Sequence, residues 1–64
     1  MYTSKKELLE NRSVSLISSS MAMFQIGIET APNDKELAKL YFEISKALAE
    51  RANIAAKKAE QEET

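Results

Sequence analysis

Cysteine, histidine and tryptophan are absent from this sequence of 64 residues, and glycine and proline occur once each. Without cysteine no disulfide forms, and without cysteine or histidine the usual ligands of zinc and redox centres are missing. We therefore expect neither a metal nor a cofactor. The lack of cysteine is also typical of proteins in a reducing compartment, so we predict a cytoplasmic location.

Long hydrophobic runs are missing as well. Residues 13–28 carry no charge, but this stretch is too short to span a bilayer and it contains several serines. Near the start, Lys5 and Lys6 are followed by Glu7 before any apolar run, which is not the pattern of a signal peptide. We predict no membrane segment, and we expect residues 13–28 to be buried in protein.

Patterns that indicate catalysis are not evident. Ser18, Ser19 and Ser20 form a run, but the chain has no histidine to activate a serine and no glycine flanks the run. A phosphate-binding loop is also missing. The net charge is -1 with both signs mixed, whereas a nucleic-acid-binding protein usually carries a basic stripe. We predict that the protein is not an enzyme.

Helix-forming residues dominate the composition and predict a single all-α domain over residues 1–64. Pro32 lies near the midpoint, where it separates two predicted helices. Ser4 and Glu7 have the spacing of a capping box, which predicts that the first helix spans about 5–30.

The turn and the second helix follow from the residues around the proline. Ala31 is expected to be non-helical because it precedes Pro32. Gly27 offers an earlier end to the first helix as a C-cap, but the apolar stripe continues past it. Asn33 and Glu36 repeat the capping-box spacing and predict that Asn33 caps the second helix. The expected bounds are a frayed start at 1–3, a turn at 31–33, a second helix at about 34–60 and a frayed tail at 61–64.

The two predicted helices carry matching rows of large and small side chains. The large rows are Val14, Ile17, Met21, Phe24 and Ile28, and Leu37, Tyr41, Ile44 and Leu48. The small rows are Ser13, Ser20 and Gly27, and Ala38, Ser45, Ala52 and Ala59. If the chain turns back at its midpoint, Phe24 faces Tyr41 and Ser20 faces Ser45. This coiled-coil-like spacing predicts an antiparallel two-helix hairpin with the large rows as its core.

Several apolar residues lie outside those rows and are predicted to form an interface. They are Leu9, Leu16, Met23, Ile26, Leu40 and Ile54. A lone hairpin does not cover this surface, so we predict that a second copy does, giving a homodimeric four-helix bundle. A monomer with an exposed apolar rim and a complex with a different protein are the alternatives.

Arg51 occupies a position in the large row of the second helix where leucine or isoleucine is expected. We predict that Arg51 forms an ion pair with Glu10 of the first helix and that this pair sets the register between the helices. The alternative is an exposed arginine that binds a carboxylate or phosphate of a partner.

A basic cluster is expected at the end of the hairpin away from the turn, where it would contact phosphates. Its members are Lys5, Lys6, Arg12, Lys57 and Lys58. The alternative is an ordinary solvated end, because Glu7, Glu10 and Glu60 dilute the positive charge.

These features predict a small non-enzymatic protein–protein interaction module, such as a regulator, adaptor or inhibitor, that docks through an apolar helix face. The alternative is a dimeric RNA- or DNA-binding hairpin that uses the basic cluster. A purely structural subunit of a larger assembly has the same sequence pattern as the first hypothesis.

Overall fold

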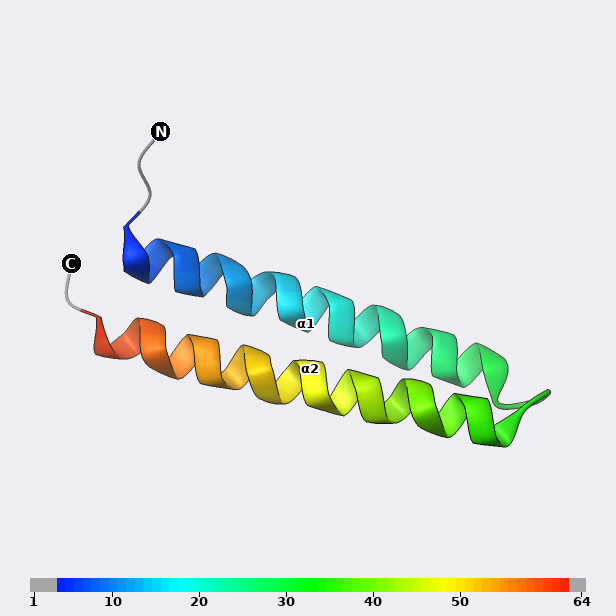
Figure 1. Cartoon of the computed structure of the whole chain (residues 1–64). Coiled ribbons are helices and arrows are strands. Elements are labelled where there is room, and N and C mark those ends of the chain that lie inside the picture. The colour runs from blue at the N-terminus through cyan, green and yellow to red at the C-terminus, as the bar shows by residue number, and fades with distance from the viewer. Residues whose placement is uncertain (1–3, 63–64) are drawn as a thin grey trace.

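The computed structural model describes residues 4–62, which form two helices that run side by side in opposite directions (Figure 1). Helix α1 spans Lys5–Thr30 and helix α2 spans Lys35–Gln61. The predicted all-α helical hairpin is therefore confirmed. Helix α2 extends one residue beyond its predicted end at 60. The predicted frayed start at 1–3, and residues 63–64 of the predicted tail, lie outside the described residues.

The start of α1 is set by the predicted capping box. The Glu7 backbone N–H donates to Ser4 Oγ at 3.1 Å, and Ser4 Oγ lies 3.2 Å from Glu7 Oε1 as a donor. Ser4 has extended backbone dihedrals, which are those of an N-cap residue. The helix begins at Lys5 because this cap satisfies one of the backbone donors that the first turn leaves free.

Helix α1 ends at Thr30, but not for the predicted reason. Ala31 was expected to be non-helical, yet it has helical dihedrals, with φ -53° and ψ -40°. Its N–H donates to the Gly27 carbonyl at 3.0 Å, so Ala31 still takes part in the helical hydrogen bonding. The helix stops at the next step, because Pro32 has no N–H to continue the ladder. The Asp34 N–H then turns back to the Thr30 carbonyl at 2.9 Å.

The N-cap of α2 is Asp34, and the prediction of Asn33 is wrong. The Leu37 N–H donates to Asp34 Oδ1 at 3.0 Å, and Asp34 has extended dihedrals, with φ -153° and ψ 95°. Asn33 belongs to the turn, where its N–H donates to the Thr30 carbonyl at 3.0 Å. A carboxylate is well placed as the cap because the N-terminus of a helix carries partial positive charge.

Replacing Asp34 by alanine should lower the free energy of unfolding by about 1 kcal/mol, the usual cost of losing an N-cap. Asn33→Ala is the matched control at the neighbouring position, and it should cost less than about 0.5 kcal/mol because its side chain caps nothing. Urea denaturation followed by circular dichroism measures both. Equal losses in the two variants would contradict the assignment of Asp34 as the cap.

The two helices meet along a seam of small residues, as predicted. Ser13 Oγ donates to the Ala52 carbonyl at 3.0 Å, and Ser20 and Ser45 lie opposite one another. Every buried residue among those described is serine, glycine or alanine. They are Ser13, Ser20, Gly27, Ala38, Ser45, Ala52, Ala55 and Ala59. Such residues allow the backbones of two helices to approach closely.

At the centre of the seam, Ser20 and Ser45 link the helices reciprocally. Each Oγ lies 2.8 Å from the carbonyl oxygen of the other residue, and the two hydroxyl oxygens are 3.0 Å apart. Each hydroxyl has one proton, so two of these three contacts are hydrogen bonds at any moment. The buried hydroxyls are thus satisfied without any side chain larger than serine.

Near the turn, Gly27 is required by the close approach of Phe42. A Cβ atom added at Gly27 would lie 2.5 Å from Phe42 Cε1 and 2.8 Å from Cδ1, well inside van der Waals contact. The Phe42 ring packs over this glycine and pairs with the Phe24 ring, with centroids 5.2 Å apart. Gly27 therefore serves as a socket for an aromatic ring rather than as a helix end.

Gly27→Ala should destabilise the protein by about 1 kcal/mol. Displacing the Phe42 ring costs roughly 1–3 kcal/mol, which exceeds the gain of about 1 kcal/mol from replacing a helical glycine by alanine. In a Phe42→Ala background the socket is empty, and Gly27→Ala should instead stabilise by about 1 kcal/mol. Thermal unfolding of the four proteins tests the change of sign; the same sign in both backgrounds would disprove this packing.

The prediction that the two large rows form the core is wrong. Ten large hydrophobic residues keep 42–68% of their surface exposed, and Phe24 pairs with Phe42 rather than with Tyr41. The reason is geometric. Seen from one end of the hairpin, successive residues of the two antiparallel helices rotate in opposite senses. Two side chains on different helices therefore point to the same side of the hairpin when each follows a seam residue of its own helix by the same number of positions. Phe24 follows Ser20 by four and Phe42 follows Ala38 by four, whereas Tyr41 precedes its seam residue.

The large rows consequently lie on opposite sides of the hairpin. We call one side the Phe24 face; its apolar residues are Val14, Ile17, Met21, Phe24, Ile28 and Phe42. The other is the Tyr41 face; its apolar residues are Leu9, Leu16, Met23, Ile26, Leu37, Tyr41, Ile44 and Leu48. The Cα extents are 48 × 22 × 10 Å, so the molecule is one helix thick and both broad faces are open.

Candidate interaction surfaces

The Phe24 face carries an apolar ridge along α1. Val14 and Met21 directly follow the seam residues Ser13 and Ser20 and are the most exposed large hydrophobic residues of the described part of the chain, at 64% and 68%. Across the seam, near the end of the hairpin away from the turn (the open end), the residues of α2 are small: Ala56 and Ala59. The result is a groove lined by Lys6, Glu10, Ser13, Val14, Ala56, Ala59 and Glu60. A ridge next to a groove is a shape that another helix can pack against.

Charge on the Phe24 face is divided along the length of the hairpin. Lys6 lies one heptad before Ser13 and continues the row of seam positions. The residues that directly follow the seam positions are Glu7, Val14, Met21 and Ile28 on α1, and Lys39, Lys46, Asn53 and Glu60 on α2. The acidic members lie near the open end. The lysines lie in the half near the turn. The apolar ridge runs between these two charged regions.

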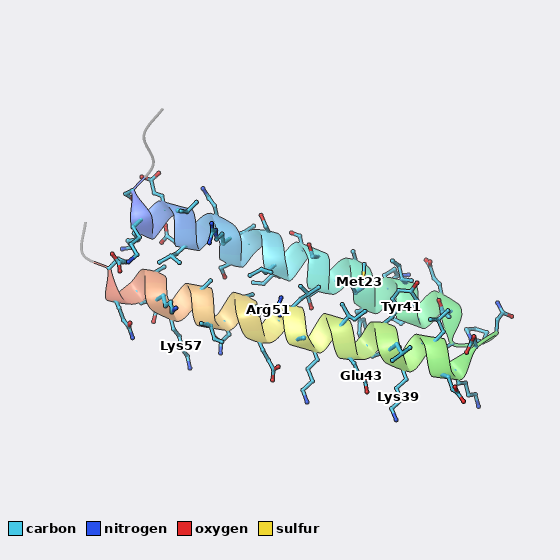
Figure 2. The ribbon with its side chains drawn as sticks, viewed as in Figure 1. Met23, Lys39, Tyr41, Glu43, Arg51 and Lys57 are labelled. Carbon is cyan, nitrogen blue, oxygen red and sulfur yellow. The ribbon has the colours of Figure 1, made fainter. Side chains whose placement is uncertain are left out.

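The Tyr41 face contains four of the predicted interface residues. Leu9, Leu16, Met23 and Ile26 are half-buried on α1, and Leu37 and Ile44 are exposed on α2. Met23, Tyr41 and Arg51 are labelled along the line where the two ribbons meet in Figure 2. Half-buried apolar side chains beside a seam form a surface that a partner helix can cover.

Leu40 and Ile54, the other two predicted interface residues, are not on either face. They follow seam residues by two positions, which places them on the outer surface of α2, and they are 55% and 54% exposed. Charged residues adjoin Leu40, where a shallow hollow is lined by Glu36, Lys39, Leu40 and Glu43. Apolar residues that are exposed singly in this way are ordinary on protein surfaces.

The predicted ion pair between Arg51 and Glu10 does not form. Arg51 directly precedes the seam residue Ala52 and so lies on the Tyr41 face, whereas Glu10 lines the groove of the Phe24 face. Within residues 4–62, the ion pair that forms is between Lys5 Nζ and Glu62 Oε2, which are 3.6 Å apart. Arg51 is exposed and free to bind a carboxylate or phosphate, as in the alternative interpretation.

The structure divides the predicted basic cluster. Lys5, Arg12 and Lys58 each directly precede a seam position and lie on the Tyr41 face. Lys6 lines the groove of the Phe24 face, and Lys57 extends from the far edge of α2 (Figure 2). The cluster is therefore not a continuous phosphate-binding track. Arg51, which the prediction did not include, joins the three cations of the Tyr41 face.

The sequence interpretation missed the Phe24 face as an exposed surface. Its residues have the spacing of a core row, and that spacing alone does not say which side of a seam they occupy. The position of each residue relative to the small row contains this information. Residues one or four after a small residue lie on one face, and those one or four before it lie on the other.

Comparison with known proteins gives no match to a protein-family model, to a curated protein or to a solved structure. In the described part of the chain, neither helix is long and apolar enough to cross a membrane. Residues 4–62 also bring together no group of three or more acidic, histidine or cysteine side chains suited to a metal ion. The two faces of the hairpin carry exposed large apolar side chains and are the candidate functional surfaces.

Proposed function

We propose that this protein is a small non-enzymatic protein–protein interaction module, a regulator or adaptor, that works as a homodimer. Two hairpins pair through their Phe24 faces into a four-helix bundle, and the Tyr41 faces remain outside for a partner protein. The observation that carries this proposal is the contrast between the seam and the faces. The seam buries only alanine, serine and glycine, while ten large apolar side chains stay 42–68% exposed.

The small seam supports self-association on energetic grounds. Burying a leucine, isoleucine, phenylalanine or methionine side chain contributes about 1.5–3 kcal/mol, and alanine contributes much less. Among the described residues, no large side chain is fully buried. A chain this short has few other means of stabilisation, and oligomerisation is one of them. Pairing two hairpins would give the large residues the interior position that the isolated hairpin does not offer.

Charge indicates that the Phe24 face, rather than the Tyr41 face, is the one that pairs. A twofold axis across the hairpin sets the open end of one copy against the turn end of the other. This axis sets α2 against α2 of the second copy, so Glu60 of each copy approaches Lys35 and Lys39 of the other. The Phe24 face is thereby complementary to itself, with the ridge of Val14, Met21 and Ile28 in the middle. On the Tyr41 face the helical residues near the turn are uncharged, and the acid at that end is the cap Asp34.

The size of the face is also sufficient. A standard protein–protein interface buries about 800 Å² on each partner, and a face with Cα extents of 48 by 22 Å offers more than this area. Pairing the ridge of one copy with the ridge and groove of the other is the packing of helical bundles. A cytoplasmic location fits the lack of cysteine.

Met21→Glu should break the dimer and raise its dissociation constant by about 100-fold or more, because an unpaired carboxylate would be buried in the interface. Light scattering over a wide concentration range measures the mass, and circular dichroism on the same samples follows helicity. Ile54→Glu is the matched control, since Ile54 is similarly apolar and 54% exposed but lies on the outer surface of α2.

Three outcomes of this experiment are informative. A dimer that Met21→Glu dissociates and Ile54→Glu does not supports the proposal. A dimer that neither variant dissociates means that the copies pair through another surface. A wild-type protein that stays monomeric at every concentration rules out the homodimer, and both faces would then be open to other proteins.

A further inference from the structure

The Tyr41 face is divided into an apolar half and a cationic half. The residues that directly precede the seam positions define its outermost surface. Near the turn they are Ser19, Ile26, Leu37 and Ile44, and near the open end they are Lys5, Arg12, Arg51 and Lys58. Four cations therefore follow a neutral apolar surface along one side of the hairpin.

Three of these four cations have no acidic neighbour among the described residues at their end of the face. The chain has ten acidic residues and nine basic ones, so the segregation is not a result of composition. In the described part of this half of the face, the one acidic residue is Glu62, and it pairs with Lys5 at 3.6 Å. Arg12, Arg51 and Lys58 are exposed, and no ion pair within the described residues involves them. They are therefore accessible to an external anion.

We infer that the Tyr41 face binds an acidic amphipathic helix of a partner protein, whose apolar side chains cover Leu37, Ile44 and the half-buried Met23 and Tyr41, and whose carboxylates meet Arg12, Arg51 and Lys58. This inference rests on the proposed function in that it names the chemistry of the partner. A helix that lies along a trough between two helices is a common mode of protein recognition. Arginine suits such a site because its planar guanidinium binds carboxylates in a bidentate manner.

A partner helix fits these observations better than a nucleic acid does. Phosphates repeat along the whole of a nucleic acid, but the cations occupy only half of this face and the other half is apolar. Leu9 also lies between Lys5 and Arg12, and Leu16 and Leu48 adjoin Arg12 and Arg51 on the side toward the turn. Among the described residues of this face the aromatic one, Tyr41, is in the apolar half, so none of them places a ring beside the cations to stack on bases.

The test uses a synthetic helical peptide of roughly 28 residues, about 42 Å long as a helix. It carries a leucine heptad stripe, with glutamates flanking the stripe in one half. A second peptide has glutamine in place of every glutamate. Fluorescence anisotropy with the full chain should show that the glutamate peptide binds about tenfold more tightly, and that added salt reduces the difference. Equal affinity for the two peptides would overturn the inference.

Adjacent lysines provide a matched pair of variants. Lys58 lies on the Tyr41 face and Lys57 on the far edge of α2, so Lys58→Gln should weaken binding of the glutamate peptide two- to fivefold and Lys57→Gln should not. The Arg12→Gln, Arg51→Gln double variant should weaken it about tenfold. Identical affinities for the two lysine variants, or tighter binding of a short RNA duplex than of the glutamate peptide, would overturn the assignment of the partner.

The same samples separate this inference from the dimer. Met21→Glu changes the Phe24 face alone, so it should dissociate the bundle and leave the affinity for the glutamate peptide within about twofold. Loss of peptide binding by the arginine double variant with an unchanged dimer mass supports the inference. Peptide binding that persists in that variant overturns it, whatever the mass of the protein.

Discussion

The close approach of the two helices along a seam of small residues is the constraint on which the rest of the structure depends. Ser13, Ser20 and Gly27 of α1 lie against alanine and serine of α2, and hydroxyl groups donate across the seam to backbone carbonyls. Larger side chains at these positions would separate the backbones and remove those hydrogen bonds. The seam therefore excludes bulky residues from the one place where an isolated hairpin has an interior.

That exclusion explains the surfaces. The large residues follow or precede the seam on each helix, so they are displaced to the two broad faces of a molecule one helix thick. The faces differ in charge: the Phe24 face has its acids at the open end and Lys39 and Lys46 in the half near the turn, and the Tyr41 face has cations at the open end. The seven-residue spacing that forms the seam also determines which charged residues lie on each face. The two faces therefore carry different charge patterns and are complementary to different partner surfaces.

The hairpin, its turn and the small seam could be predicted from the sequence because each depends on local chemistry or on a repeat of seven. The capping box at Ser4, the single proline and the opposition of Ser20 with Ser45 are examples. The identity of the second cap could not be predicted, since Asn33 and Asp34 are both good caps and only the turn hydrogen bonds decide between them. The sides on which the large rows lie depend on the opposite senses of rotation of two antiparallel helices, which matching residue sizes do not reveal.

The uniformity of the seam has a consequence for how the chain finds its alignment. Because serine or alanine recurs at every seventh position, sliding one helix past the other by a heptad would again place small residues against small ones. The exception is the socket at Gly27, which accepts Phe42 in one alignment only. The short turn and the Phe42 ring therefore both select the native alignment. If the chain were cut at the turn into two helical peptides, only the packing of Phe42 on Gly27 would still distinguish the native alignment from one shifted by a heptad.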